Sequence, residues 1–352
     1  MSSLFPPGKG MIRVDRGRFG ELVERLGADA EARLRSVFSS MQRDRSSRLF
    51  FLINPKQVAA AEAKVFLAEG EEARLITFPF EAGFLPCMDF RGMDEGEALA
   101  KIRTLSSPSS RILGSYAASL QSIRNALVTL TGKKIDLAEA SRIVRRTILR
   151  NKAAFRYKET SKFCVVCGHY AVSPIEVEVR LPCEERHRYV EASVFKIDDV
   201  VMLAWEEGIV LEGYVSAVLK AEGWNAVISS DVVGIHGSRH EIDVLAERDD
   251  NYLIAECKHL APYNEVSYDD IMLGFGKMVV IESALRATYA ERGLAIKRVF
   301  KAFVTTGKLA RTKMVRDMLL ESPEFLVVER EDVVNGLRAL RRRLRKATSV
   351  GD

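Results

Sequence analysis

The pattern of hydrophobic and polar positions is most regular between residues 211 and 258. Apolar side chains recur there every three or four positions from Leu211 to Leu219, which predicts a helix buried on one side that ends at Gly223. β-Branched and aromatic residues then predict strands at 224–228, 241–246 and 252–257. Because only a short charged turn separates the last two strands, we expect them to form a hairpin.

The same alternation of helical and extended patterns continues to the C-terminus. It predicts, in order, a helix, a strand, a helix, a strand and a final helix, at 268–292, 299–304, 310–320, 325–328 and 332–346. Together with the preceding segment, this order is α-β-β-β-α-β-α-β-α. It predicts an α/β domain over residues 196–352, with a mixed sheet flanked by helices.

Two further domains are expected upstream. A small α/β domain of unknown role is predicted for residues 1–105, with helices and strands at 20–41, 49–53, 55–67, 73–80 and 95–105. The sequence SSPSS at 106–110 is typical of a linker. Residues 111–195 would then form a separate region that begins with two helices, at 116–130 and 136–157.

The composition is that of a folded protein. The chain has 352 residues, of which 47% are hydrophobic and 29% are charged, so it is long enough for two or three domains. No apolar stretch approaches the length of a bilayer span or of a signal peptide core, so we expect a cytoplasmic protein without a membrane partner. The net charge of +5 is compatible with a polyanionic partner.

The second predicted helix of the middle region is strongly basic. Spacings of three, four and eight residues place several of its cations on one stripe, which predicts contacts with DNA phosphates. A solvated helix face is the alternative interpretation. The residues concerned are Arg142, Arg145, Arg146, Arg150 and Lys152.

Cysteine and histidine residues in the middle region have the spacing of metal ligands. Cys164 and Cys167 form a Cys-x-x-Cys pair, and Cys183 and His187 follow after about fifteen residues, with His169 as a spare ligand. We interpret the segment 164–187 as a zinc-ribbon-like site for structural Zn²⁺. A redox dithiol and a coincidental arrangement are the alternatives.

The hairpin carries the residues with the clearest catalytic chemistry. Strand alternation brings Asp243 and Glu256 side by side, with Lys258 pointing the same way as Glu256. Two close carboxylates repel each other unless a cation lies between them, and hard oxygen ligands suit Mg²⁺ or Mn²⁺. Lys258 would orient or deprotonate the attacking water, and Glu212 on the preceding helix would support the site. A surface hairpin with exposed ion pairs is the alternative.

Residues 205–335 resemble the PD-(D/E)XK nuclease superfamily, and in particular its Mrr-like type IV restriction endonuclease branch. The resemblance rests on the order of Glu212, Asp243 and Glu256-x-Lys258, and on the segments HEIDVLA, AECKH and VFKAFVTTGK. It implies a restriction-endonuclease-like core, binding of the divalent ion by Asp243, Glu256 and the backbone carbonyl of Cys257, and a Mg²⁺-dependent DNA endonuclease. Family members often carry a Gln on the helix after Glu-x-Lys, and residues 271–284 contain none.

Several functional questions stay open at this point. A Holliday-junction-type nuclease of the same superfamily and a DNA-binding protein that has lost turnover are the alternative functions. Because cutting both strands of a duplex usually needs two active sites, we expect a homodimer. Backbone and hydroxyl donors at Thr305, Thr306 and Gly307 could meet a phosphate. His240, three residues before Asp243, could reach the scissile phosphate or the metal ion.

Overall fold

In the computed structural model, the 352 residues of the chain form two compact units. Unit 1 comprises 1–53, 129–131 and 200–352, and unit 2 comprises 54–128 and 132–199. The structure describes residues 13–53, 60–66, 72–78, 97, 114–164, 167, 169–174, 177–178, 180–187, 189–233, 239–260, 264–291, 293–309, 322 and 324–348.

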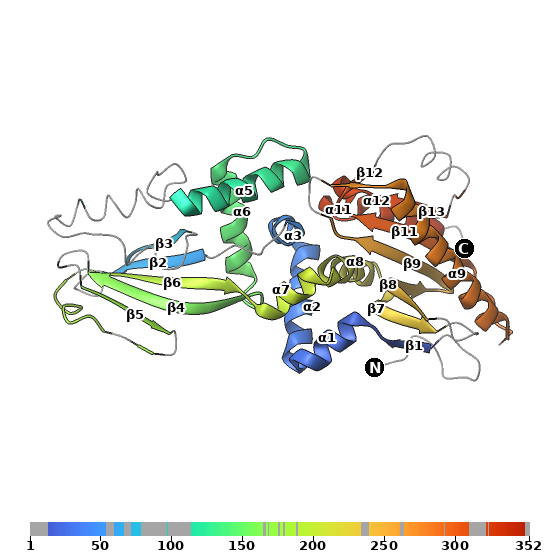
Figure 1. Cartoon of the computed structure of the whole chain (residues 1–352), viewed down its shortest axis with the longest axis horizontal. Helices are drawn as coiled ribbons and strands as arrows, with labels where there is room; N and C mark the ends of the chain where they lie inside the picture. The colour runs from blue at the N-terminus through green and yellow to red at the C-terminus, as the bar shows by residue number, and fades with distance from the viewer. Residues whose placement is uncertain are drawn as a thin grey trace. The chain divides into compact units, whose positions relative to one another are not determined.

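A six-stranded mixed sheet forms the centre of unit 1 (Figure 1). Its strands, in spatial order, are β1 (Arg13–Arg16), β7 (Asn225–Val233), β8 (Arg239–Arg248), β9 (Asn251–Lys258), β11 (Arg298–Thr305) and β13 (Phe325–Val328). Adjacent strands from β1 to β9 are antiparallel to one another. The strands β9, β11 and β13 are parallel to one another. Two short parallel strands, β10 (Glu265–Val266) and β12 (Lys308–Leu309), form a second small sheet.

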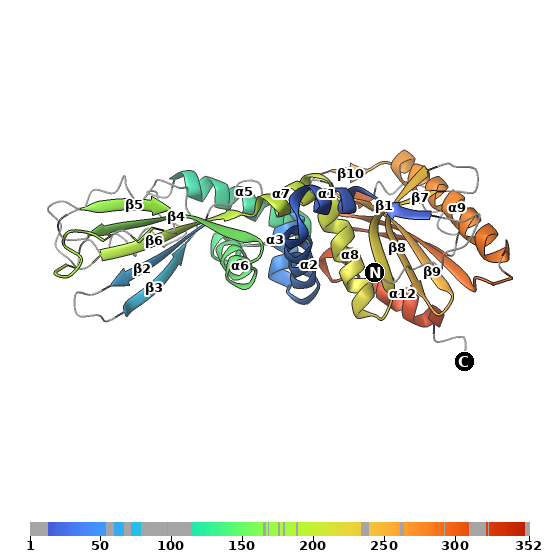
Figure 2. The ribbon, with the colours of Figure 1, turned by 90° about the horizontal axis from the view of Figure 1, so that it is seen from below.

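Helices cover both faces of this sheet. Figures 1 and 2 show α8 on one side and α9 on the other. A buried cluster that includes Ile254, Ile271, Met278 and Phe303 fills the space between the sheet and α9. The helices that lie wholly or mostly in unit 1 are α1 (Arg18–Leu26), α2 (Ala28–Arg43), α3 (Arg45–Leu52), α7 (Asp199–Glu206), α8 (Ile209–Ala221), α9 (Tyr268–Glu291), α11 (Arg330–Val334) and α12 (Arg338–Thr348).

Unit 2 is built on a five-stranded antiparallel sheet. Its strands are, in spatial order, β3 (Glu72–Phe78), β2 (Ala60–Phe66), β6 (Tyr189–Ile197), β4 (Phe155–Cys164) and β5 (Tyr170–Pro174). The helices α5 (Gly114–Thr131) and α6 (Leu137–Arg150) come directly before β4 in the chain. None of the helices that the structure describes combines the length and apolar character that a membrane span requires.

The predicted order of elements from residue 209 onward is confirmed wherever the structure describes the chain. The helix α8, the hairpin of β8 and β9, the long helix α9 and the strands β11 and β13 lie where the periodicity places them. The predicted helix 310–320 lies outside the described residues. The last predicted helix is two helices, because Gly336 and Leu337 have positive φ angles of 88° and 56° and end α11.

Three elements upstream were predicted wrongly. Residues 49–53 were expected to form a buried strand but belong to helix α3 and its C-terminal end. At the N-terminus of α3, the Asp44 side chain accepts a hydrogen bond from the Ser47 amide. A short apolar run has no periodicity that separates a buried strand from a buried helix. Within the predicted helix 55–67, residues 60–66 form β2, and the predicted helix 136–157 ends at Arg150.

The domain boundaries also differ from the expectation. Residues 13–53 were assigned to a separate N-terminal domain that reached residue 105, but they belong to unit 1, where β1 pairs with β7 and α2 packs against α8. Unit 2 therefore combines 54–105 of that expected domain with most of the middle region. The linker 106–110 and nearly all of the helix 95–105 lie outside the described residues.

Candidate functional site

Asp243 and Glu256 lie at neighbouring positions of the central hairpin. Val244 of β8 pairs with Ala255 of β9, so the same register places Asp243 beside Glu256 one step further along the strands. The Asp243 side chain is buried, and its Oδ2 accepts a hydrogen bond of 2.6 Å from the Cys257 amide. Burial and the negative charge of Glu256 raise the pKa of Asp243 to about 6. The two carboxylates thus form the close acidic pair that the sequence predicted.

Glu212 joins this pair from helix α8. Its carboxylate is 1% exposed and accepts a hydrogen bond from the hydroxyl of Ser229 on β7. Burial, followed by the charge of Asp243, raises the pKa of Glu212 to about 8. The helix therefore contributes an acid to the same cluster, as expected from its position before the hairpin.

Arg18, which the sequence analysis missed, is the main cation of the cluster. Its Nη2 lies 3.0 Å from Glu212 Oε1 and 3.4 Å from Asp243 Oδ1, and its Nε forms an ion pair with Glu241. Glu241 and Asp243 are two residues apart on β8, so strand alternation alone could have identified Glu241. Arg18 lies about two hundred positions away in the chain, and no local pattern connects it with the hairpin.

Gly17 allows Arg18 to approach the site. A Cβ atom at Gly17 would lie 2.0 Å from the Ser229 carbonyl oxygen, so only glycine fits where the end of β1 meets β7. Ser229 itself has a positive φ of 43°. The first residue of α1 is thereby held directly beside the acidic cluster.

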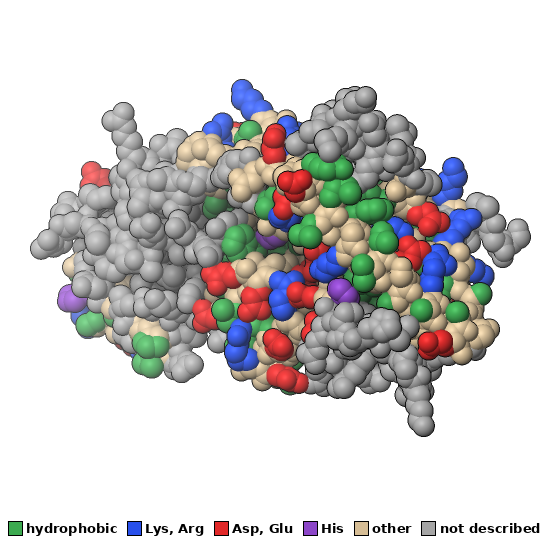
Figure 3. Space-filling model, turned by 45° about the vertical axis from the view of Figure 1, so that its right-hand side comes forward, with side chains coloured by type: hydrophobic (Ala, Val, Ile, Leu, Met, Phe, Trp, Pro, Cys, Tyr) green, Lys and Arg blue, Asp and Glu red, His purple; other side chains and the backbone are tan. Residues whose placement is uncertain are grey.

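Two lysines pair with acids around Glu256 and α9. Lys277 of α9 contacts Glu256 Oε2 at 2.7 Å, and Lys258 pairs with Asp270 in the first turn of α9. Lys277, which was not predicted, supplies a cationic contact from α9 to Glu256. On the face drawn in Figure 3, acidic and basic side chains are interspersed. Charge in this region is therefore arranged as local pairs.

Thr305 and Thr306 were expected to offer donors to a phosphate, but both side chains are buried. Thr305 Oγ1 donates to the Lys258 carbonyl at 2.9 Å, and Thr306 Oγ1 donates to the Leu260 carbonyl at 2.7 Å. Their hydroxyls instead fix the backbone that follows Glu256. His240 lies on β8 and is partly buried, and its suggested contact with a phosphate stays a prediction.

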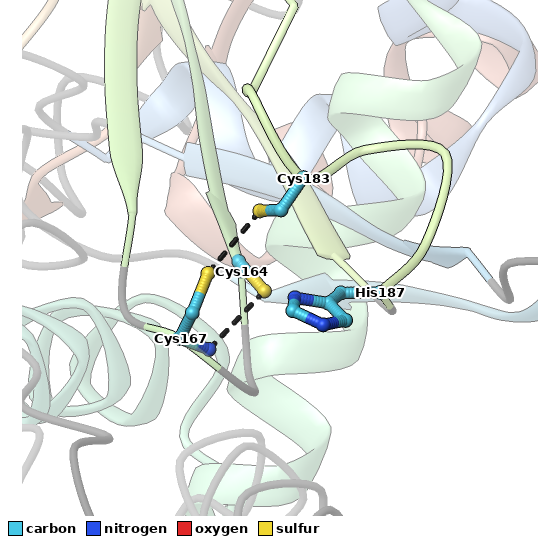
Figure 4. A group of neighbouring side chains, drawn as sticks. All are labelled: Cys164, Cys167, Cys183 and His187. Atoms are coloured by element: carbon cyan, nitrogen blue, oxygen red, sulfur yellow. Dashed lines mark hydrogen bonds between the residues drawn. The ribbon is translucent and has the colours of Figure 1, made fainter.

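The predicted metal ligands of unit 2 converge at one point. Ligand atoms of Cys164, Cys167, Cys183 and His187 all lie within 4.8 Å of one another (Figure 4). Cys164 is at the end of β4, Cys167 follows it in a turn, and the His187 amide donates to the Cys183 carbonyl in a second turn. These four side chains could hold a metal ion such as zinc, for which three thiolates and one imidazole are a common set of ligands.

Burial and hydrogen bonding in this cluster favour a bound cation. The Nδ1 atom of His187 is buried and has no hydrogen-bond partner among the residues that the structure describes. Burial opposes ionisation of Cys167, but hydrogen bonds from His169 outweigh it and lower the pKa of Cys167 to about 5. Burial and the neighbouring thiols raise the pKa of Cys183 to about 12. Without a metal, Cys167 and Cys183 thus cannot easily be ionised at the same time. A zinc ion would stabilise all three thiolates together.

The basic helix is α6, and its cations lie on one exposed stripe. Arg142, Arg146 and Arg150 recur every four residues and are exposed, whereas Ile143 and Ile148 are buried. Lys152 is exposed in the turn after the helix. The Arg145 side chain lies outside the described residues, although its backbone is helical. The arrangement fits the predicted stripe, and its contact with DNA stays a prediction.

Neither a protein-family model nor a curated protein matches this chain. Among solved structures, a protein of unknown function designated AF1548 matches with 17% sequence identity and a TM-score of 0.24, over 34% of this chain and 56% of that one. Protein VC1899 from Vibrio cholerae matches with 14% identity and a TM-score of 0.33, over 75% of this chain and 57% of that one.

A third solved structure is Can2 from Sulfobacillus thermosulfidooxidans in complex with cyclic tetra-adenylate. It matches with 11% identity and a TM-score of 0.29, over 70% of this chain and 56% of the Can2 chain. In all three cases the match spans little more than half the length of the other protein.

Proposed function

We propose that this protein is a metal-dependent nuclease that hydrolyses phosphodiester bonds of DNA at the cluster of Asp243, Glu256 and Lys258. The observation that supports this proposal most directly is the position of Asp243 beside Glu256 on the central hairpin, with Glu212 buried next to them. The mixed sheet with a helix on each face is the scaffold expected of a restriction-endonuclease-like core.

The acidic cluster fits a divalent cation. It contains four carboxylates, Glu212, Glu241, Asp243 and Glu256, and two cations contact them, Arg18 and Lys277. The raised pKa of Glu212, about 8, means that its negative charge is unfavourable here without a cation. When all four carboxylates are ionised, four negative charges less two positive charges leave an excess that one Mg²⁺ or Mn²⁺ would neutralise. Oxygen ligands from carboxylates suit these ions. Asp243, Glu256 and the Cys257 carbonyl would hold the ion.

When bound, the metal would polarise the scissile phosphate and activate water. Lys258, 36% exposed at the end of β9, would orient or deprotonate the attacking water and offset charge on the phosphate. In this structure its ammonium pairs with Asp270, so Lys258 must exchange that partner for the phosphate. Arg18, which contacts Glu212 and Asp243, could contact the substrate once a metal ion neutralises these carboxylates.

DNA is the proposed substrate because the described surface offers a basic stripe. Arg142, Arg146 and Arg150 on α6 are spaced to follow a phosphate backbone. Within this class we favour an Mrr-like type IV restriction enzyme acting as a homodimer, on the strength of the sequence motifs. A structure-specific nuclease for four-way junctions and an inactive DNA-binding protein are the competing proposals.

Cleavage of supercoiled plasmid tests the proposal. Methylated and unmethylated plasmid are incubated with the protein and Mg²⁺, Mn²⁺ or EDTA, beside the variant Asp243→Ala. We expect metal-dependent nicking or linearisation that the variant lacks, with a preference for methylated DNA. Cleavage that survives both EDTA and Asp243→Ala would refute the assigned site.

Absence of plasmid cleavage would separate the alternatives. Cleavage of a synthetic four-way junction alone would identify a junction-specific nuclease. DNA binding without cleavage of any substrate, and with no effect of Asp243→Ala, would identify an inactive binding protein.

A further inference from the structure

An arginine-lined pocket lies in unit 1, apart from the acidic cluster. Its volume is about 290 Å³, and three separate stretches of the chain form its wall. Five of the ten lining residues are arginines and none is acidic. The lining residues are Gln42, Arg43, Arg45, Arg48, Val218, Val334, Asn335, Gly336, Arg338 and Arg341.

Arg48 forms the buried floor of this pocket. It is 8% exposed, and its guanidinium donates to the carbonyls of Met41, Gln42 and Val334 at 2.8 to 3.1 Å. No carboxylate of the described residues pairs with it. Three of the five N–H donors of a guanidinium are thus used, and two are left. These carbonyl bonds fix the orientation of Arg48, so it is held in place before any ligand arrives.

The other arginines surround this floor. Arg45 and Arg338 are exposed and have no hydrogen-bond or ion-pair partner among the described residues. Arg43 donates to the hydroxyl and the carbonyl of Ser39. Among the described residues, Arg341 is the one lining arginine with an acidic partner, Glu222, which it shares with Arg345.

Acidic side chains near the pocket are already engaged elsewhere. Asp44 accepts from the amide and hydroxyl of Ser47 at the start of α3. Asp332 accepts through Oδ1 from the Ala339 amide at the start of α12, and its Oδ2 is buried with no hydrogen-bond partner among the described residues. Four of the five arginines of the lining thus have no carboxylate partner among the described residues, so its positive charge is only partly balanced. Such an arrangement is stabilised by an anion with several oxygen atoms, because planar guanidinium groups bind phosphate oxygens in pairs.

We propose that this pocket is a binding site for a phosphoryl group, carried either by a small phosphorylated molecule or by a nucleic-acid strand. Arg48 supplies the fixed donors, and Arg45 and Arg338 close on the oxygens from the rim. The site is independent of the metal cluster. Asp243→Ala should therefore leave its affinity unchanged.

Calorimetric titration of the full chain with inorganic pyrophosphate in EDTA tests this site. The variant R45Q/R338Q removes two rim cations without touching the buried Arg48. The control R342Q/R343Q removes the same charge from exposed positions of α12 that do not line the pocket. We expect saturable binding by the wild type, a loss of about tenfold in affinity for R45Q/R338Q, and less than about threefold for the control.

Equal losses in the two variants, or no saturable binding by the wild type, would overturn the proposal. Competition by a short DNA strand then identifies the source of the phosphoryl group. Two strands are compared, one with a 5′-phosphate and one without. If both displace pyrophosphate, the pocket binds backbone phosphodiesters. If only the strand with the 5′-phosphate displaces it, the pocket binds a terminal phosphate. Failure of both strands to compete indicates a small phosphorylated molecule.

Discussion

At the scale of single residues, the acidic cluster shows how charged groups constrain one another. Asp243 and Glu212 are buried beside other carboxylates, and both have raised pKa values. Arg18 and Lys277 each neutralise part of that charge. Because buried charges are costly without partners, these cations and the proposed metal ion are parts of one electrostatic balance.

Substitution of Lys258 distinguishes a catalytic role of this residue from a structural one. Its ion pair with Asp270 is about one third exposed on both sides, so Lys258→Ala should change the free energy of unfolding by less than about 1 kcal/mol. Plasmid cleavage should fall by about a hundredfold or more, because the variant lacks the group that we propose to serve the attacking water. Lys297→Ala removes a more exposed pair with Asp250 and should retain full activity. Equal activity of the two variants would contradict the assigned role.

Glu222 provides a prediction about pH. Hydrogen bonds from Arg345 and Arg341 of α12 lower the pKa of Glu222 below its ordinary value of 4.5. A lowered pKa in the folded state adds stability at neutral pH, and that stability is lost as the pH falls below 4.5. Glu222→Gln should therefore cost roughly 1 kcal/mol at pH 7, and the difference from wild type should shrink in acid.

Chemical denaturation across the pH range measures this effect. Glu31→Gln is a suitable control because Glu31 forms an exposed pair with Arg35 within one helix. The control should show no comparable dependence on pH. A constant difference between Glu222→Gln and wild type from pH 7 to pH 3 would exclude the proposed linkage.

At the scale of elements, the packing of α2 on α8 depends on a single glycine. A Cβ atom at Gly213 of α8 would lie 2.3 Å from the ring of Phe38 on α2. Alanine normally stabilises a helix interior relative to glycine, but here it would overlap a buried ring. Gly213→Ala should thus destabilise the protein by about 2 kcal/mol, as measured by denaturant unfolding.

A double-mutant cycle identifies the cause. Phe38→Ala alone should cost about 3 kcal/mol, because it leaves a cavity. In the background Phe38→Ala, the further change Gly213→Ala should cost little or add stability, because the clash is gone. Additive losses would show that Gly213 is required for some reason other than contact with Phe38.

The turns that follow β4 and Leu181 depend on the proposed zinc ion. Cys164→Ser should release zinc, which we expect at one ion per chain, and should lower the melting temperature. His187→Ala should have the same effect. Glu185→Ala is the control, because Glu185 is exposed in the same turn and is not one of the four converging ligands. Metal analysis of freshly reduced protein that finds no zinc would end this hypothesis.

At the scale of the whole molecule, unit 1 is assembled from both ends of the chain. The N-terminal segment contributes a strand to the six-stranded sheet and buries Leu34, Val37, Phe38 and Met41 in helix α2. Unit 2 is inserted between these two parts in the sequence. Folding of unit 1 therefore requires contacts between residues that are far apart along the chain.

Removal of residues 1–53 tests this arrangement. We expect unit 1 of the shortened chain to lose its cooperative unfolding transition, because α8 and β7 would expose apolar surface that α2 and β1 cover. Zinc binding by unit 2 should survive, because all four ligands lie outside the deleted segment. Circular dichroism and limited proteolysis measure the first effect. A native-like transition for unit 1 would show that the N-terminal segment is dispensable.

Local pattern in the sequence determined a large part of the fold and of the site. Helical periodicity and strand alternation predicted α8, the hairpin, α9 and the later strands. The spacing of Glu212, Asp243, Glu256 and Lys258 brought out the acidic pair, and the spacing of the cysteines brought out the metal cluster. The structure brings these residues together because they lie on one hairpin and its neighbouring helix, or on adjoining turns, where chain geometry limits their separation. Their roles in catalysis and metal binding stay predictions.

Only the tertiary structure decided which distant segments complete these sites. It placed Arg18 next to Glu212 and Asp243, made residues 49–52 a helix instead of a strand, and gathered three stretches of chain around Arg48. The physical reason is common to all three results. Short apolar runs and isolated cations have no periodicity of their own, so their conformation and partners depend on packing against residues far away in the sequence.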